Sequence, residues 1–368
     1  MRVFRSCALL LLGGWLAACS AGAPAAAPKA ASPAAPATAA PAASSAAPAP
    51  AAPVAAAPAT PPPAEKIGVT FSSRTPNQLP LWLAYERGYF TQNGLEVDEL
   101  PFLSSTLAGQ GIISNSVQFG LIGTEGIDLN LEAGSPVTKY VAGVTPKLVF
   151  KVIAQPDIRS VADLRGKTVA ATRQGSVTDF LWRKVLELNG LQLGRDVDIA
   201  YPGSTDGAYT ATLAGQIAAT PITTPLEIQA EQQGLHVLLD VEQMNIPYLM
   251  GGVVVRTDYA ETHPDVVERY LKAHLQGVAT TLNDPEAALP VLGKYMQVED
   301  RELQRAGYET FRPTFTRDQL VPEDAVIATL NESPRPNAKS ANPRDFYDNS
   351  YLERLKQSGF VDSLYAGR

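Results

Sequence analysis

Short polar runs, several of them containing glycine, follow apolar segments at a number of places in this sequence of 368 residues. Their hydroxyl, guanidinium and backbone N–H groups can donate hydrogen bonds to a small polar molecule. Two runs contain an arginine, Arg74 and Arg173, and a pair of guanidinium groups could hold a carboxylate or a sulfonate. Reversible binding is the chemistry that these residue types favour. The candidate ligand-binding residues are Ser72, Ser73, Arg74, Gly123, Thr124, Glu125, Arg173, Gly175, Ser176, Thr223, Thr224 and Tyr248.

Several of these candidates also have a purely structural interpretation. Ser176 and Thr124 each precede a helical pattern, where the hydroxyl group could cap the helix instead of contacting a ligand. Gly175 suits a tight turn, although a glycine there also lets a ligand approach the backbone closely. Glu125 would repel an anion unless its carboxylate orients an arginine. The two arginines could equally be solvated loop residues.

Residues for catalysis or metal binding form no recognisable pattern. The three histidines, His236, His263 and His274, fall in a strand start, a helix start and a long helical pattern, and both cysteines lie in the first 19 residues. A zinc site or a Cys–His pair therefore lacks the residues that it needs. The Gly-x-Ser-x-Gly and Walker patterns do not occur. We predict no catalytic residue, no metal site, no cofactor and no enzymatic activity.

The N-terminus has the pattern of an export leader that ends in a lipidation site. Arg2 and Arg5 provide positive charge, and the apolar run that follows is too short to cross a bilayer stably. Residues 16–19 read Leu-Ala-Ala-Cys and resemble a bacterial lipobox, in which Cys19 would carry the lipid. The sequence thus predicts a leader over residues 1–18 and a lipid-anchored protein outside the cytoplasm. Which bacterial membrane carries the anchor stays open.

Residues 20–64 have the composition of an extended tether. Of these 45 positions, 36 are alanine or proline, including 12 prolines. Proline interrupts helix and sheet hydrogen bonding, and alanine buries too little area to offset the entropy of ordering. Together with the lipidated cysteine, residues 19–64 are predicted to be a disordered tether that reaches roughly 140 Å when fully extended, at about 3.1 Å per residue. It would hold the folded residues away from a membrane surface.

The folded part of the chain is acidic. Residues 1–64 contain three basic and no acidic residues, so residues 65–368 contain 27 basic and 37 acidic residues and carry a net charge of −10. The broad basic face that nucleic acid or an anionic membrane would require is therefore not expected. A small ligand at one local site remains compatible with this charge. A monomer is the default expectation.

Short strand patterns alternate with helical patterns from residue 66 onward, which is typical of α/β folds with mainly parallel sheets. In such folds the ligand binds beyond the carboxyl ends of the strands, where loops and helix N-termini meet. The candidate binding residues follow these expected strand ends, except Tyr248, which lies near the expected return crossover to lobe 1. The expected strands are 66–71, 94–100, 117–122, 167–171, 198–201, 217–222, 236–241 and 247–255. The expected helices are 79–90, 103–113, one ending at 188, one ending at 213, 264–282, 285–295, 302–308 and 321–330.

Five segments of the sequence resemble one family of solute-binding proteins. This family serves bacterial ABC importers and includes binders of nitrate, sulfonates, taurine and thiamine pyrimidines. The segments occur in the order that the family shows, and the resemblance extends over roughly residues 65–310. They are residues 79–84 (LPLWLA) with 88–90 (GYF), 93–97 (NGLEV), 163–169 (DLRGKTV), 263–267 (HPDVV) and 283–287 (NDPEA).

The resemblance implies a type II periplasmic binding protein fold, in which two α/β lobes are joined by a hinge of two crossovers. We expect lobe 1 to contain residues 65–155 and 249–368, and lobe 2 to contain residues 156–248. The implied partners are a small-molecule ligand and a membrane complex of ABC permease and ATPase. At two helix-to-strand junctions the family usually has an aspartate, where this chain has Gln118 and Ala218. The resemblance therefore does not identify the ligand.

Two classes of ligand remain open at this point. An oxyanion such as a sulfonate or nitrate follows from the two arginines and the helix N-termini, and we expect this class first. Arg173→Ala should then abolish binding of an anion. A flat heteroaromatic, such as a thiamine-type pyrimidine or a flavin, follows if Trp82 or Tyr248 faces the cleft, although Trp82 and Tyr89 have a helical spacing that also suits the core. The alternative to transport is a sensory role, in which the closed form signals to a membrane partner.

Overall fold

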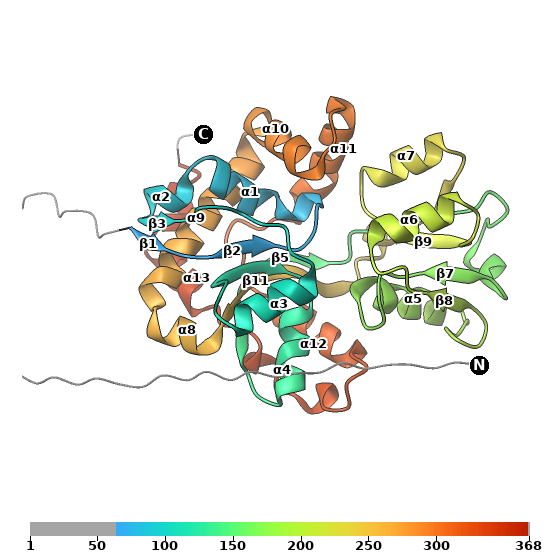
Figure 1. Cartoon of the computed structure of the whole chain (residues 1–368), viewed down its shortest axis with the longest axis horizontal. Helices are drawn as coiled ribbons and strands as arrows, with labels where there is room; N and C mark the ends of the chain where they lie inside the picture. The colour runs from blue at the N-terminus through green and yellow to red at the C-terminus, as the bar shows by residue number, and fades with distance from the viewer. Residues whose placement is uncertain (1–63, 367–368) are drawn as a thin grey trace, which may run out of the picture. The chain divides into compact units, whose positions relative to one another are not determined.

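The fold described here is that of a computed structural model, which describes residues 64–366. The expected leader, the lipidation site at Cys19 and the expected tether lie outside the described residues. Residues 64–366 fall within one compact unit that contains two larger sheets (Figure 1). We call the four-stranded sheet with its helices lobe 1, and the five-stranded sheet with its helices lobe 2.

Among residues 64–366, no helix combines the length and the apolar character that crossing a membrane requires.

The sheet of lobe 1 has at its centre a strand that comes from late in the sequence. Its strands, in spatial order, are β2 (Val69–Phe71), β4 (Phe119–Ile122), β11 (Pro247–Arg256) and β5 (Thr138–Lys147). β2 and β4 are parallel, whereas β11 is antiparallel to both of its neighbours. A separate pair of short parallel strands is formed by β1 (Glu65–Lys66) and β3 (Leu95–Glu96).

Helices cover both faces of this sheet. They are α1 (Leu79–Glu86), α2 (Tyr89–Gln92), α3 (Ser105–Ile113), α4 (Glu125–Ala133), α8 (Thr257–Thr262), α9 (Pro264–Asn283), α10 (Pro285–Met296), α11 (Arg301–Phe311), α12 (Glu323–Glu332), α13 (Ser350–Gln357) and α14 (Phe360–Ser363). Successive residues of a strand point to opposite faces. Val253 and Val255 accordingly pack in the apolar cluster of α1 and α9, whereas Val254 packs in that of α3, α4 and α12. α1 and α9 approach closely at Gly277, where an added Cβ would lie 2.0 Å from the Pro80 carbonyl oxygen.

Lobe 2 is made from one continuous stretch of the chain. Its strands, in spatial order, are β10 (His236–Asp240), β6 (Lys151–Ala154), β9 (Ala219–Ile222), β7 (Thr168–Ala170) and β8 (Asp198–Ala200). β7 is parallel to β8 and β9, and β6 is antiparallel to β9 and β10. The sheet of lobe 2, like that of lobe 1, is therefore mixed.

The helices of lobe 2 also lie on opposite faces of its sheet. They are α5 (Val177–Leu188), α6 (Thr205–Leu213) and α7 (Leu226–Gln232). Val169 packs in the apolar cluster of α5, whereas the next residue, Ala170, packs in that of α6. The fully buried Trp182 of α5 also donates a hydrogen bond from its indole N–H to the Ala170 carbonyl oxygen, at 2.8 Å. These contacts fix α5, and with it the loop that precedes α5, to the carboxyl end of β7.

Two strands were not expected from the sequence, namely β5 and β6. Both are buried on both faces, so neither shows the alternation of apolar and polar residues that indicates a half-buried strand. They run antiparallel to neighbours, and the expectation of mainly parallel sheets is therefore wrong for lobe 1, where only β2 and β4 are parallel. Because β6 pairs inside lobe 2, the first crossover lies before Lys151 and not at the expected boundary of 155.

Two other expected elements are shorter than predicted. The helix expected over residues 79–90 is divided into α1 and α2, because Gly88 has a left-handed φ of 68°. The strand expected over residues 94–100 is reduced to β3, which pairs only with the short β1. Helical periodicity located the later helices well, since α9 and α10 begin at the predicted Pro264 and Pro285.

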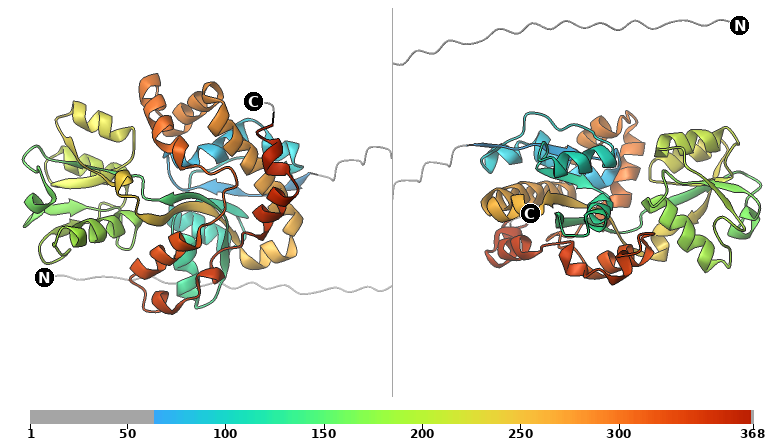
Figure 2. Two further views of the ribbon diagram at one scale, coloured as in Figure 1. Left: turned by 180° about the vertical axis from the view of Figure 1, so that it is seen from behind. Right: turned by 60° about the horizontal axis from the view of Figure 1, so that its bottom comes forward.

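The chain after α11 packs against the sheet of lobe 1 and completes this lobe (Figure 2). The Tyr140 N–H of β5 donates to the Phe346 carbonyl oxygen, and the Tyr140 carbonyl oxygen accepts from the Asp348 N–H, both at 2.9 Å. α12 packs against β11. The free edge of β5 is thus covered by the C-terminal segment, which also places α12 beside α4.

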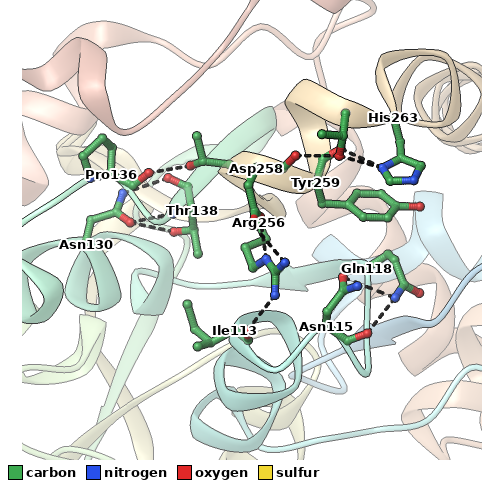
Figure 3. Close-up of polar contacts among 12 residues, drawn as sticks. Ile113, Asn115, Gln118, Asn130, Pro136, Thr138, Arg256, Asp258, Tyr259 and His263 are labelled. Atoms are coloured by element: carbon green, nitrogen blue, oxygen red, sulfur yellow. Dashed lines mark hydrogen bonds and ion pairs between the residues drawn. The ribbon is translucent and has the colours of Figure 1, made fainter.

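Gln118 has a structural role at the amino end of β4. Its side-chain oxygen accepts from the Gly68 N–H at 2.6 Å. Its side-chain N–H donates to the Asn115 carbonyl oxygen at 2.8 Å, as Figure 3 shows. Nearby, the Arg256 guanidinium donates to the Ile113 carbonyl oxygen at 3.1 Å and ties the end of α3 to the end of β11. Because ligands bind at the carboxyl ends of the strands, this end of the sheet faces away from the expected site.

The second departure from the family pattern, Ala218, is also at the amino end of a strand, β9. The backbone there is bonded by Gln155, whose side-chain N–H donates to the carbonyl oxygens of Thr212 and Ile217 at 2.5 and 3.2 Å. The Gln155 backbone N–H donates to the Ala218 carbonyl oxygen at 2.9 Å. The two missing aspartates therefore belong to positions that join helices to strands.

Candidate functional site

A small cavity lies between the two lobes, beyond the carboxyl ends of β4 and β7. Its wall comes from the start of α4 and from Tyr248 of β11, from the start of α5 in lobe 2, and from the end of α12 with the residues that follow. The cavity has room for about one or two water molecules, because the volume that the centre of a water molecule can occupy is about 20 Å³. The wall residues are Thr124, Ile127, Asp128, Gly175, Ser176, Asp179, Phe180, Arg183, Tyr248, Thr329, Glu332, Ser333 and Pro334.

On the side of lobe 1, the start of α4 faces the cavity. Thr124 is the N-cap residue of α4, but its side chain makes no capping hydrogen bond. Gly123 leaves room for the Glu125 carboxylate, because an added Cβ at Gly123 would lie 3.0 Å from Glu125 Oε2. That oxygen is buried and has no hydrogen-bond partner among the described residues. The polar groups of this edge are therefore only partly satisfied.

On the side of lobe 2, the start of α5 is fully bonded. Ser176 is the N-cap, and its hydroxyl oxygen accepts from the Asp179 N–H at 3.4 Å, as the capping interpretation of this serine requires. Gly175 adopts a left-handed φ of 75°, which favours glycine at this turn. Its N–H donates to Asp179 Oδ2 at 3.0 Å. The Asp179 side chain thus bonds the loop from inside the helix.

Asp179 also fixes the one arginine that lines the cavity wall. The Arg183 Nε and Nη2 groups each donate to Asp179 Oδ2 at 3.2 Å, and the Tyr201 hydroxyl donates to Asp179 Oδ1 at 2.8 Å. The Asp179 side chain is only 2% exposed, whereas that of Arg183 is 44% exposed. Arg183 therefore presents an oriented guanidinium group to the cleft while its charge is largely balanced by Asp179.

An ion pair connects the two lobes beside the cavity. Arg173 Nη2 of lobe 2 donates to Glu125 Oε1 of lobe 1 at 2.6 Å. Glu125 thus orients an arginine, which is the condition under which its carboxylate was expected at an anion site. The same contact engages Arg173 with a carboxylate of the protein, so that this guanidinium is not free to bind an anion in the arrangement described here.

Asp128, one turn further along α4, has a perturbed titration. Burial, followed by the negative charge of Glu125, raises the pKa of Asp128 from the ordinary aspartate value of 3.8 to about 6. Arg173 and Arg335 oppose this rise; Arg335 Nε lies 3.6 Å from Asp128 Oδ1. The charged form of Asp128 is therefore incompletely compensated, and a positively charged group in the cavity would lower the free energy of that form.

Two aromatic side chains form one wall of the cavity. Tyr248 of β11 and Phe180 of α5 are stacked, with ring centroids 4.5 Å apart and ring planes inclined by 12°. Tyr248 thus already stacks on a residue of the protein, and the pair presents a combined aromatic surface to the cavity. Trp82 does not face the cavity: it is fully buried in the core of lobe 1 and stacks on Tyr295 at 4.9 Å.

Gly123, Glu125 and Arg173 lie beside the cavity, and two further groups of expected binding residues do not line it either. Arg74 follows Ser72 and Ser73 after β2, and its guanidinium lies 4.8 Å from the Phe102 ring centroid and 3.4 Å from Gln297 Oε1. The structure therefore does not bring Arg74 and Arg173 together as a clamp. Thr223 and Thr224 after β9 are buried, and the Thr224 hydroxyl donates to Glu227 Oε1 at 2.5 Å.

Most of the cavity wall was missed by sequence reasoning. Asp179 and Arg183 follow Ser176 at spacings of three and seven, on the same face of α5, so the serine cap could have indicated both. Asp128 follows Thr124 at a spacing of four and therefore lies on the same face of α4. No local sequence pattern indicated the residues at the end of α12, because they reach the cleft only through the packing of α12 against β11.

The described residues contain no group of three or more His, Cys, Asp or Glu side chains that could hold a metal ion. Of the histidines, His236 begins β10, His263 caps α9, and His274 is buried within α9. None of these three lines the cavity. What the cavity wall offers is hydrogen bonding, ion pairing and aromatic contact, which together suit binding.

Comparison with known proteins places this arrangement in a family. Residues 75–288 match the model of a family described as NMT1/THI5 like. A Bacillus subtilis protein named for the binding of aliphatic sulfonates is 25% identical over 287 residues, which span 75% of this chain and 84% of that protein. Riboflavin-binding protein RibY of Chloroflexus aurantiacus is 24% identical over 234 residues, 61% of this chain and 66% of RibY.

Solved structures share the fold at low sequence identity. The sulfonate-binding protein SsuA of Methylobacillus flagellatus is 16% identical and aligns with a TM-score of 0.64, over 81% of this chain and 96% of SsuA. The nitrate-binding protein NrtA of Synechocystis is 14% identical, with a TM-score of 0.62 over 83% of this chain and 91% of NrtA. The expected periplasmic binding protein fold is confirmed.

Proposed function

Because the chain belongs to the NMT1/THI5-like family, we propose that it is the extracytoplasmic solute-binding protein of an ABC importer. The observation that carries this proposal is the cavity between the lobes, whose wall combines side chains from both. Relatives and solved structures with this fold are named as binding proteins for sulfonates, nitrate or riboflavin. The solute would pass to a permease and ATPase complex in the membrane.

Capture of the solute would require the lobes to move. A cavity with room for about one or two water molecules is too small for an organic solute, so the lobes must separate to admit one. Contacts from both lobes then favour a closed state around the solute. The Arg173–Glu125 pair lies beside the cavity and would open and re-form as the lobes move.

The cavity wall supports a small organic solute with a flat body. The Tyr248–Phe180 pair supplies an aromatic surface, and hydroxyl, carboxylate and guanidinium groups surround it. Stacking on such a surface adds to the binding free energy of a flat ligand, beyond the contribution from the apolar area that it buries. This combination favours the heteroaromatic class over a bare inorganic oxyanion, which would face several carboxylates and a single guanidinium that is already paired.

A sulfonate is the second candidate, and Arg183 is the observation that favours it. This guanidinium is oriented by Asp179, which is in the first turn of α5, the end of the helix where backbone N–H groups favour an anion. The names of relatives agree with this class. If the ligand is an anion, Arg183 takes the role that the sequence suggested for Arg173.

The lipid anchor at Cys19 is part of the proposal. It rests on the lipobox-like residues 16–19 and on the alanine- and proline-rich residues 20–64. A tethered, monomeric binding protein would stay beside its permease while its lobes remain free to reorient. Labelling with a radioactive or alkyne-bearing fatty acid would test the anchor, because Cys19→Ser should remove the label.

Thermal unfolding against a panel of solutes tests the binding function. The panel contains alkanesulfonates, nitrate, aminopyrimidines and riboflavin. A solute at about 100 times its dissociation constant should add roughly 2.7 kcal/mol to the free energy of unfolding and raise the unfolding midpoint. A rise with one class supports the proposal and selects the ligand. No rise with any of them, even at millimolar concentration, would contradict it.

A further inference from the structure

The third wall of the cavity comes from a part of the chain that the family model does not include. The match to the family ends at residue 288, whereas α12 begins at Glu323. Thr329, Glu332, Ser333 and Pro334 all line the cavity. Pro334 reaches across to lobe 2, because a Cβ added at Gly175 would lie 3.7 Å from Pro334 Cγ. This wall therefore contacts the same space as the two lobe edges.

The wall is held firmly in place by lobe 1. The Thr329 hydroxyl oxygen accepts from the Leu249 N–H of β11 at 3.1 Å. Arg335 pairs with Asp128 and with Glu132 of α4. The Asn337 side-chain N–H donates to the Leu131 carbonyl oxygen at 2.8 Å. The backbone between these anchors, including that of Glu332, is thereby fixed relative to α4.

The charges around the cavity do not balance. The acidic and basic residues of the wall are Asp128, Asp179, Glu332 and Arg183. Arg183 is balanced by Asp179, and Asp128 shares Arg335 with a second carboxylate. The Glu332 side chain makes no ion pair and no hydrogen bond with any residue of the described part of the chain. Negative charge is thus in excess at the wall formed by α4 and α12.

The position of Glu332 is also unfavourable for its own helix. It is the last residue of α12, where the helix carries partial negative charge, and carboxylates stabilise the opposite end. The stability of α12 therefore does not explain a glutamate at this place. A group that approaches Glu332 through the cavity would offset both the helix dipole and the excess carboxylate charge.

We propose that Glu332 is a specificity-determining residue of the cleft, which selects flat solutes that carry a positive charge. Glu332 and Asp128 would face the charged nitrogen of the solute, and the Tyr248–Phe180 pair would contact its flat body. This inference rests on the proposed binding function and specifies the ligand class. Specificity for charge would then lie outside the part of the chain that the family model covers.

The test uses three probes of one shape and different charge: benzamidine, benzamide and benzoate. They share a planar ring with a planar substituent and carry a positive, zero and negative charge at neutral pH. Dissociation constants are measured by calorimetry or by NMR titration of the purified protein. Benzamidine should bind at least about tenfold more tightly than benzoate, with benzamide between them, since a few partly screened charge contacts give this order of effect.

Variants of Glu332 connect this preference to the residue. Glu332→Gln should weaken benzamidine about three- to tenfold and leave benzamide within about twofold, since only the charged probe loses a partner. Glu332→Lys should reverse the order of benzamidine and benzoate. Glu261→Gln changes an exposed carboxylate of α8 that does not line the cavity, and it should leave all three constants unchanged. Unfolding midpoints show that each variant is folded.

Three results would overturn the proposal. They are a wild-type protein that binds benzoate as tightly as benzamidine, an unchanged ratio of these constants in Glu332→Gln, and binding of a solute from the thermal panel without binding of any of the three probes. In each case the protein still binds a small molecule, so the binding function stands and only the role of Glu332 is lost. A protein that binds no solute at all would instead contradict the proposed function.

Discussion

The polar groups at the two helix starts that face the cleft, those of α4 and α5, differ in how completely they are hydrogen-bonded. In both lobes a parallel strand leads into a helix whose first turn borders the cavity: β4 leads into α4, and β7 into α5. At α5, Ser176 caps the helix and Asp179 bonds a backbone N–H, an arginine and a tyrosine. At α4, Thr124 makes no capping bond and one oxygen of Glu125 has no partner in the described part of the chain.

The start of α5, which we call the α5 edge, is therefore preformed. The start of α4, the α4 edge, depends on groups outside it and can change when a ligand binds or the lobes move. The α5 edge keeps its geometry without help from a ligand, because each of its buried polar groups has a partner inside lobe 2. The α4 edge contains carboxylates whose charges are compensated only across the cleft or by the C-terminal segment. Changes at α5 should therefore affect stability, whereas changes at α4 should affect stability, pH dependence and lobe closure together.

The largest expected effect is the loss of the buried carboxylate at α5. Asp179→Ala should lower the free energy of unfolding by about 3 kcal/mol, because it removes the buried acceptor of the Gly175 N–H, the Arg183 guanidinium and the Tyr201 hydroxyl, at about 1 kcal/mol for each partner. Chemical denaturation measures this difference. Asp206→Ala changes an exposed acid in the first turn of α6 and should cost no more than about 1 kcal/mol. Equal effects would mean that the α5 edge is not preformed.

The next largest effect is an increase in the free energy of unfolding, and it comes from a change in α4. The folded pKa of Asp128, about 6, is above its ordinary value of 3.8, so its ionisation destabilises the folded state as the pH rises from about 4 to above 6. Asp128→Asn removes this penalty and should raise the free energy of unfolding at pH 7.5 by up to about 2 kcal/mol.

Denaturation of both proteins from pH 4 to pH 7.5 measures the difference. The gain of Asp128→Asn should largely disappear near pH 4, where the wild-type carboxyl is protonated in the folded state and partly protonated in the unfolded state. A variant that is less stable than the wild type at pH 7.5 would show that the contact with Arg335 outweighs the cost of burial.

The capping residues allow a direct comparison at matched positions. Ser176→Ala should cost about 1 kcal/mol, because it removes a capping hydrogen bond. Thr124→Ala should change stability by less than about 0.5 kcal/mol, because no capping bond is lost. Thermal and denaturant unfolding of the two single variants give both numbers. Equal costs would remove the distinction between the two helix starts.

The smallest expected effect concerns the ion pair between the lobes. A double-mutant cycle with Glu125→Gln and Arg173→Met should give a coupling of about 0.5 kcal/mol in stability, since Arg173 is 40% exposed and solvent screens the pair. Each single variant should also shift the distance distribution between spin labels placed on the two lobes. An unchanged distribution would mean that the pair does not hold the lobes together.

The fold could be predicted from the sequence to a large extent, and the exceptions have a common cause. Helical periodicity and proline at the first turn located α9 and α10, and strand patterns located β4, β7 and β9. β5 and β6 were missed because both of their faces are buried. A strand without a solvent-facing side has no alternation to detect.

The candidate site could be predicted only in part. The positions of Thr124, Gly175 and Ser176 followed from the rule that ligands bind beyond strand ends. Arg183 was missed although its spacing from the Ser176 cap places it on the same face of α5, and Glu332 was not indicated, because it lies about 150 residues from the α5 side of the cavity. Contacts between distant segments arise from tertiary packing, and a local pattern carries no information about them.

The central position of β11 has a consequence for the order in which the chain can fold. Lobe 2 draws its sheet from residues 151–240, so a growing chain could complete it early. Lobe 1 cannot do so, because β4 and β5 have no common neighbour until Arg256 has been synthesised. Until then both strands expose unpaired backbone edges, which are sites of association with other chains. Lobe 1 is thus the half of this protein whose strand edges stay open to such association for longer during synthesis.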